Sequence, residues 1–209
     1  MSSDQLIDRM LAAESGVDLW RLRTGRLKSG EGDDDFQRIG EAMGVLSEAP
    51  IFIDDAGSAN IMEIRTMARR LQAEQNVGVL IIDYLQLMEG RSGGDNRVNE
   101  ISEISRSLKQ LAKELNIPVI ALSQLSRAVE QRSPQIPKLS DLRESGSIEQ
   151  DADIVMFLYR EDREKPDTPN KNIVEVHISK HRNGPVGRMS LYFNENLTTF
   201  KSLERAHTG

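Results

Sequence analysis

The residues best suited to phosphate chemistry are two polar side chains that each follow an apolar segment. Asp83 comes directly after the apolar residues 79–82, and Gln124 comes shortly after the apolar segment 117–122. Open α/β sheets bind ligands at the carboxyl ends of their strands, where a carboxylate can hold Mg²⁺ through water. An amide at the same edge can hydrogen-bond a terminal phosphate and change its contacts when that phosphate leaves. Each residue taken alone is more typical of a turn, a helix cap or a backbone-bonded loop amide.

A polar segment with a glycine at its bend, residues 140–153, precedes another apolar stretch. The Arg143 guanidinium and the backbone N–H groups near Gly146 are suited to contact a nucleic-acid phosphate. The alternative is a solvated loop whose charges pair with one another, and taken alone the segment favours this alternative.

A basic segment, residues 180–185 (KHRNGP), contains the residues of a turn. From a rigid turn, Lys180 and Arg182 can reach across a subunit interface to the γ-phosphate of a neighbour's nucleotide and stabilise charge in the transition state. The alternative is a hairpin tip that stays polar for solubility. The three histidines of the chain do not have the spacing of metal ligands.

The pattern of apolar residues predicts the elements that must position these side chains. Apolar residues three or four apart predict helices, unbroken apolar runs predict buried strands, and alternation predicts strands with one wet face. The hairpin expected around the turn is antiparallel, with strands 174–178 and 189–193. The other predicted elements are helices at 3–14, 36–46, 60–71 and 98–115, and strands at 51–53, 77–82, 117–122 and 154–159. The sequence therefore predicts an α/β fold, in which strands 77–82 and 117–122 are central and buried.

Composition and charge limit the class of protein. The chain has 209 residues, no cysteine and a net charge of −6. It contains no apolar run long enough to span a membrane and no apolar signal segment, so we expect a cytoplasmic protein without membrane contact. Residues 1–95 carry 10 basic and 17 acidic side chains, whereas residues 96–209 carry 17 and 16. Any contact with nucleic-acid phosphates is therefore expected in the second half.

Taken in order, these segments resemble the C-terminal motor domain of replicative DNA helicases of the DnaB type, which has a RecA-like P-loop NTPase fold. The similarity covers nearly all of the chain and is carried by LIIDYLQLM, EISEISRSLKQLAKELNIPVIALSQLSR, SDLRESGSIEQDADIVMFLYR and KHRNGPVG. The resemblance implies a mostly parallel central sheet flanked by helices, followed by a C-terminal antiparallel hairpin.

The resemblance also implies a role for each matching residue. Asp83 corresponds to the Walker B aspartate, which associates with Mg²⁺ through water, and Gln124 corresponds to the glutamine that senses the nucleotide. Lys180 and Arg182 correspond to the pair that reaches a neighbour's ATP, and Arg9 corresponds to an arginine near the nucleotide. The residues that match positions contacting single-stranded DNA are Arg127, Arg143, Glu144 and Gly146.

The sequence departs from the family pattern in one respect that bears on activity. It contains no G-x-x-x-x-G-K-[ST], the Walker A loop that cradles phosphates. We therefore expect residues 1–209 to form one partial RecA-like ATPase domain that lacks the Walker A segment and is inactive by itself. We also expect the chain to be a piece of a longer protein.

Two functional interpretations from different classes follow. By resemblance, the intact protein is an ATP-dependent DNA helicase that uses ATP and Mg²⁺ at the interfaces of a homo-hexamer and moves 5′–3′ along DNA. Single-stranded DNA, primase and a helicase loader are its expected partners. The alternative is a non-catalytic RecA-like module that binds DNA or joins a ring. A recombinase-type ATPase is a third possibility, because one fold hosts many functions.

Overall fold

The structure is a computed structural model that describes residues 2–30, 34–57, 60–90 and 97–203, with only the backbone at 143–145. The chain packs as two compact units, each assembled from segments that are distant in the sequence. The first unit comprises residues 1–55, 160–174 and 190–209, and the second comprises residues 56–159 and 175–189.

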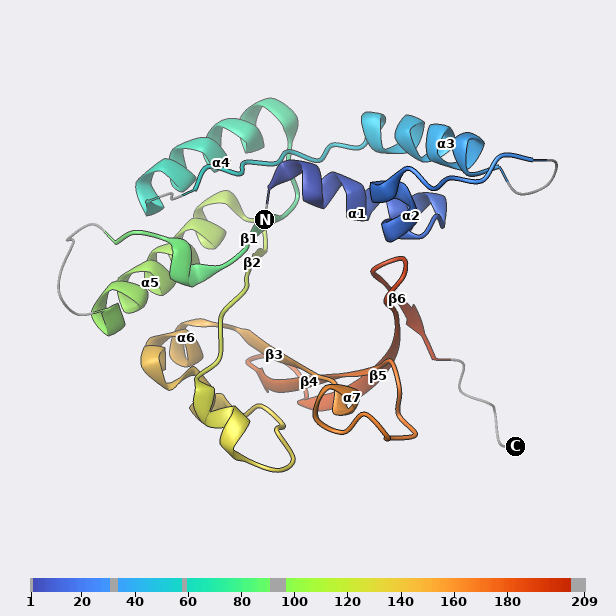
Figure 1. Cartoon of the computed structure of the whole chain (residues 1–209). Coiled ribbons are helices and arrows are strands. Elements are labelled where there is room, and N and C mark those ends of the chain that lie inside the picture. The colour runs from blue at the N-terminus through green and yellow to red at the C-terminus, as the bar shows by residue number, and fades with distance from the viewer. Residues whose placement is uncertain (1, 31–33, 58–59, 91–96, 204–209) are drawn as a thin grey trace. The chain divides into compact units, whose positions relative to one another are not determined.

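Three capped helices make up the N-terminal part of the first unit: α1 (Ser3–Ser15), α2 (Leu19–Thr24) and α3 (Asp35–Glu48) (Figure 1). The side chains of Ser2, Asp18 and Asp34 accept hydrogen bonds from backbone N–H groups of the first turns. Such N-caps satisfy donors that have no partner inside the helix. α1 packs against both α2 and α3.

A buried carboxylate ties α2 to α3. Asp35 is fully buried and accepts hydrogen bonds from the Lys28 N–H at 2.8 Å and from Arg38 Nη2 at 2.6 Å. It also pairs with Arg21 of α2. The Lys28 hydrogen bond, with the two guanidinium groups, lowers the pKa of Asp35. The carboxylate therefore stays charged, and it depends on all three partners because an unpaired buried charge is strongly destabilising.

The C-terminal part of the first unit contains the short helix α7 (Glu161–Glu164), the end of β5 (Gly187–Asn194), and β6 (Thr199–Ser202). β5 and β6 pair antiparallel, with Phe193 opposite Phe200 and their ring centroids 5.0 Å apart.

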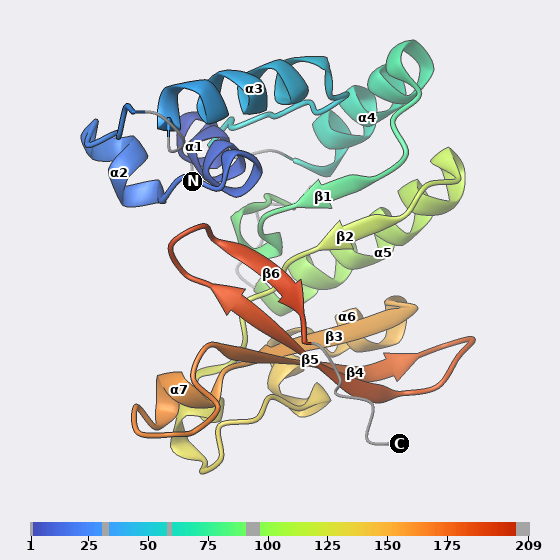
Figure 2. The ribbon, with the colours of Figure 1, turned by 90° about the vertical axis from the view of Figure 1, so that its right-hand side faces the viewer.

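The second unit is built around two parallel strands and the helix between them. β1 (Leu80–Ile82) and β2 (Val119–Ala121) pair in register, so that Ile82 lies opposite Ala121. Figure 2 shows both strands beside α5 (Arg97–Leu115). A 3₁₀ turn, η1 (Leu85–Leu87), follows β1. α4 (Ile61–Gln75) precedes β1 and begins with a capping box of Asn60 and Glu63.

One face of α5 supplies much of the core. Its apolar residues recur three or four positions apart, as the helical period requires. The residues buried on this face are Ile101, Ile104, Leu108, Leu111 and Leu115. They pack with apolar residues of α4, β1 and β3, so α5 holds the sheet and the preceding helix in place.

The remainder of the second unit leads from β2 to an antiparallel sheet. η2 (Arg127–Gln131), η3 (Leu139–Ser145) and α6 (Gly146–Asp151) connect β2 to β3 (Ile154–Tyr159). β3 pairs antiparallel with β4 (Ile173–His181), with a register shift between Val155 and Met156. The order of this sheet is β3-β4-β5-β6.

The predicted fold class is confirmed, but the prediction of strands buried on both faces is wrong. Ile81 is 61% exposed and Ile120 is 46% exposed, whereas Ile82 is buried against α5. Alternate side chains of a strand point to opposite faces. In the described chain only one face of β1 and β2 is covered, and β3 shows the same alternation. Among the described strands, β1 and β2 pair in parallel, whereas β3 with β4 and β5 with β6 pair antiparallel.

Residues 51–53 do not form the predicted strand, because no described segment pairs with them along a ladder. Isoleucine and phenylalanine favour strands, but a strand also needs a hydrogen-bonded neighbour. None of the described helices has the length and apolar character needed to cross a membrane.

Candidate nucleotide and nucleic-acid site

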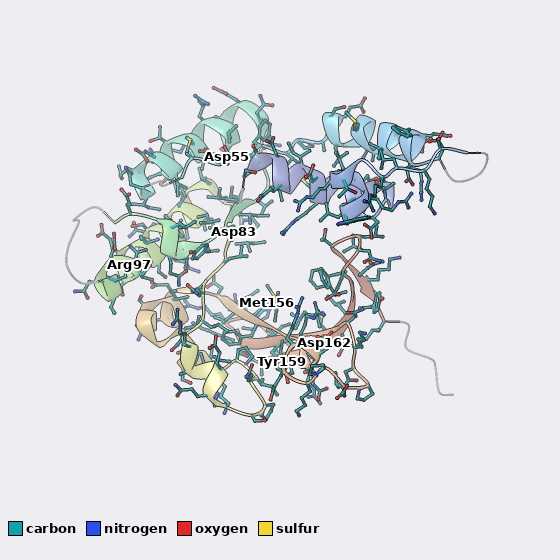
Figure 3. All side chains as sticks on the ribbon, in the orientation of Figure 1. Asp55, Asp83, Arg97, Met156, Tyr159 and Asp162 are labelled. Atoms are coloured by element: carbon teal, nitrogen blue, oxygen red, sulfur yellow. The ribbon has the colours of Figure 1, made fainter. Side chains whose placement is uncertain are left out.

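Asp83 and Gln124 leave the parallel sheet at the same edge. β1 ends at Ile82 and β2 ends at Ala121, its register partner, and the Leu122 N–H donates to the Ile82 carbonyl at 2.9 Å. Asp83 follows Ile82 directly and is exposed, and Gln124 follows three residues after β2 and is also exposed. Figure 3 labels Asp83 at this position. Both side chains are therefore available to a ligand at the carboxyl edge.

Gln86, which sequence reasoning did not single out, joins the two segments. Its side-chain carbonyl accepts the Gln124 N–H at 3.2 Å, and its Nε2 donates to Ser123 Oγ at 3.1 Å and to the Gln124 carbonyl at 3.4 Å. One amide thus holds the backbone of Gln124 from both sides. The sequence offers no signal for this contact, because a polar residue after a strand is ordinary.

The beginning of α5 is tied to the same region. Arg97 Nη2 donates to the carbonyls of Gln86 at 2.7 Å and Met88 at 3.1 Å. Figure 3 labels Arg97 at the beginning of α5. Arg97 also pairs with Glu100, which accepts the Gly90 N–H at 2.5 Å. The Gly90 hydrogen bond, followed by the Arg97 contact, lowers the pKa of Glu100. Residues 91–96, a glycine-containing segment between Gly90 and Arg97, lie outside the described residues.

The residues expected to contact DNA lie in the connection between β2 and β3. Arg127 is exposed at the start of η2, and Gly146 is exposed at the start of α6. Arg143 and Glu144 lie in η3, but their side chains are outside the described part of the chain. The structure thus brings these four residues into one connection without testing their roles.

Lys180 and Arg182, at the end of β4 and just after it, contact their own unit. The Lys180 ammonium donates to the carbonyls of Glu149 and Gln150, the latter at 3.3 Å, and Arg182 Nη2 donates to Gln150 at 3.0 Å. Arg182 Nε lies 3.4 Å from a carboxylate oxygen of Asp153. Free carbonyls at a helix C-terminus attract cations. In the chain alone, these side chains therefore fold onto the end of α6 instead of extending outward, and their role in a neighbour's site stays a prediction.

Asp153 is a second residue that sequence reasoning missed. Its carboxylate pairs with Lys109 of α5, and its backbone carbonyl accepts the Arg182 N–H at 2.8 Å. The Lys109 hydrogen bond is the main reason that the pKa of Asp153 is lowered. Asp153 therefore links α5 to the basic turn. Arg9, the remaining predicted residue, lies exposed on α1 in the first unit.

The residues at the sheet edge fit part of a magnesium–nucleotide site. Asp83 is exposed, as a carboxylate must be to hold Mg²⁺ through water. Within the described ranges, no group of three or more His, Cys, Asp or Glu side chains is placed to hold a metal ion. The sequence also has no phosphate-cradling loop. The set therefore fits a metal held mainly by water and phosphate oxygens, and no catalytic step is assigned to this chain alone.

An α/β sheet with a carboxylate and an amide at the carboxyl edge of adjacent parallel strands is typical of nucleotide-binding domains. The chain belongs to the DnaB-like helicase C-terminal domain family, whose model matches residues 1–202.

Relatives and solved structures agree with this family. The chain is 53% identical over 206 residues to the replicative DNA helicase DnaB of Geobacillus stearothermophilus, covering 98% of this chain and 44% of that protein. It is 52% identical over 222 residues to the DnaB of Rickettsia prowazekii, covering 98% of this chain and 45% of that protein. The chain thus spans less than half the length of these relatives.

Two solved structures share the fold at a TM-score of 0.90 and 42% identity over 98% of this chain. One is described as the ATPase domain of G40P, of which 72% is covered. The other is a DnaB-like replicative helicase described together with its interactions with primase, of which 49% is covered.

Proposed function

We propose that this chain is part of the motor of a replicative DNA helicase, in which ATP hydrolysis at hexamer interfaces drives movement on single-stranded DNA and duplex unwinding. The observation that supports this most is the placement of Asp83 and Gln124 at one sheet edge in a chain that matches the helicase family over residues 1–202. The mechanism needs positioning and charge stabilisation more than covalent chemistry.

Each predicted residue has a part in this proposal. Asp83 holds Mg²⁺ through water beside ATP, and Gln124 contacts the terminal phosphate and responds when it leaves. Lys180 and Arg182 leave the end of α6 in the assembled ring and stabilise charge at a neighbour's ATP. Arg9 contributes near the nucleotide. The exposed positions of Asp83, Gln124 and Arg9 support these assignments.

We propose that single-stranded DNA binds through Arg127, Arg143, Glu144 and Gly146, mainly at its phosphates. Such contacts tolerate any sequence and weaken with salt. The intact protein is proposed to be a homo-hexamer that moves 5′–3′ and works with primase and a helicase loader. The primase partner is supported by the description of one structural neighbour.

We further propose that residues 1–209 represent one partial motor domain without its Walker A segment. The alternative is a non-catalytic RecA-like module that binds DNA or joins a ring. The DNA upstream of the Met1 codon separates the two interpretations. An in-frame P-loop there supports the motor, and a stop codon directly upstream supports the module.

Binding of single-stranded DNA tests the proposal on the chain itself. Arg143→Ala should weaken the binding of a fluorescent oligothymidine several-fold and reduce the slope of log affinity against log salt by about 1. Arg70→Ala, which removes the same charge from an exposed position on α4, serves as the control and should change neither quantity by as much. Equal effects of the two substitutions would remove Arg143 from the site.

A further inference from the structure

We propose that Asp141 is a positioning residue for single-stranded DNA, because its buried carboxylate and backbone close the segment between the two arginines expected to bind phosphate. The inference rests on the proposed function, since it assumes that Arg127 and Arg143 contact DNA.

Asp141 joins the two ends of the segment 126–141 to each other. The Asp141 side chain is only 4% exposed, and it accepts the Lys138 N–H at 2.7 Å and Arg132 Nη2 at 2.5 Å. Its backbone carbonyl accepts the Ser126 N–H at 3.0 Å. Residues 126 and 141 are therefore joined directly, although 14 residues of chain lie between them.

The ion pair between Arg132 and Asp141 also holds the interior of the segment. Arg132 Nη2 also donates to the Ile136 carbonyl at 3.3 Å, so one guanidinium connects the carboxylate to the far side of the loop. Leu142, the next residue after Asp141, is buried in the core that packs on α5. The closed segment is therefore anchored to the rigid part of the unit, not only to itself.

The carboxylate is charged at neutral pH despite its burial. Burial alone would raise the pKa of Asp141, but the Arg132 and Lys138 hydrogen bonds outweigh it and lower the pKa below 3.8. A buried charge of this kind is stable only with its partners in place. Removing the charge should therefore release Arg132 and loosen the segment.

The consequence for DNA comes from chain connectivity. Arg127 directly follows Ser126, and Arg143 follows Asp141 by two residues. The Ser126–Asp141 hydrogen bond thus fixes the spacing between the backbones of the two arginines before DNA arrives. A preorganised pair of phosphate contacts binds more tightly than a mobile pair, because less freedom is lost on binding.

Asp141→Asn distinguishes positioning from simple electrostatics, because the two make opposite predictions. The substitution removes one negative charge, which by itself should tighten the binding of a phosphate chain. Loss of positioning should instead weaken the binding of a fluorescent 20-nucleotide oligothymidine by about fivefold. Glu130→Gln makes the same charge change at an exposed position nearby and should leave affinity equal or higher. Unchanged or tighter binding by Asp141→Asn would overturn the inference.

A second variant decides the matter if Asp141→Asn lowers the melting temperature so far that the chain is unfolded. In the native chain a single nitrogen, Arg132 Nη2, donates to both the Asp141 carboxylate and the Ile136 carbonyl. Arg132→Lys keeps the positive charge, but the lysine side chain is shorter and its ammonium does not reach the position of Nη2. Weaker DNA binding with an unchanged circular dichroism spectrum, together with faster trypsin cleavage after Arg127 and Lys138, supports the inference. Affinity and cleavage equal to those of the unmodified chain overturn it.

The same titration separates this inference from the proposed function. If the unmodified chain binds no oligothymidine even at low salt, the proposed DNA contact fails, and the role of Asp141 in it fails too. If the unmodified chain binds and Asp141→Asn behaves like Glu130→Gln, only the role of Asp141 fails.

Discussion

The Asp162 carboxylate binds both Nε and Nη2 of Arg160, at 2.9 and 2.7 Å, and accepts a third hydrogen bond from the Asn172 N–H at 2.8 Å. Only 8% of the Asp162 side chain and 15% of the Arg160 side chain are exposed. The Arg160 hydrogen bonds are the main reason that the pKa of Asp162 falls from 3.8 to about 2. We predict that Asp162→Asn destabilises the first unit through loss of this charge.

The pKa change sets the magnitude. The difference between 3.8 and about 2 corresponds to about 2.5 kcal/mol, at about 1.4 kcal/mol per pKa unit. A carboxylate whose pKa is lower in the folded state stabilises the fold above its unfolded pKa, and this contribution disappears as the pH falls through the folded pKa. The free energies of unfolding of wild type and Asp162→Asn should therefore differ by about 2 kcal/mol at pH 5 to 7 and converge between about pH 4 and pH 2.

Urea unfolding followed by tryptophan fluorescence measures the difference in the free energy of unfolding, and the signal comes from the first compact unit. Trp20 is the only tryptophan of the chain and lies on α2, in the same unit as Asp162. Asp167→Asn is the matched control, because Asp167 is exposed and lies, like Asp162, between β3 and β4. This substitution should change the free energy of unfolding by less than about 0.5 kcal/mol. The reasoning is refuted if the two variants are equally stable at pH 7, or if the Asp162→Asn difference persists unchanged at pH 3.

Two further predictions concern ATP. Residues 1–209 alone should show no ATPase activity above background, because their sequence lacks a phosphate cradle; turnover that disappears on substituting Asp83 would contradict this. In the DnaB of Geobacillus stearothermophilus, alanine at the position aligned with Arg182 should leave nucleotide binding intact and lower the hydrolysis rate by about a thousandfold or more. Unchanged steady-state hydrolysis in that variant would exclude a trans-acting role.

Local patterns in the sequence were sufficient for most of the elements. The apolar period of α5 and the alternation of β4 and β5 appear directly in the residue order, because helices and strands impose fixed periods on their buried faces. The capping box of Asn60 and Glu63 is equally local, since its partners are three residues apart. A polar residue shortly after each apolar run likewise predicts that Asp83 and Gln124 lie at the same edge of the sheet.

Contacts between residues distant in the sequence could not be predicted in this way. Gln86 meets Gln124 across 38 residues, and Lys109 meets Asp153 across 44, so no local period marks either pair. The same holds for the burial of Asp141, which looks like one acid among several in a polar segment. Partner choice depends on the three-dimensional path of the chain.

The sequence by itself determined the type and order of the long helices and of five of the strands, the position of Asp83 and Gln124 at the carboxyl edge, and the family to which the chain belongs. Only the tertiary structure decided which face of β1 and β2 is covered, whether 51–53 finds a strand partner, and where Lys180 and Arg182 rest. The physical reason is that backbone period is a property of neighbouring residues, whereas burial, strand pairing and ion pairing require a second segment whose position no single stretch of sequence specifies.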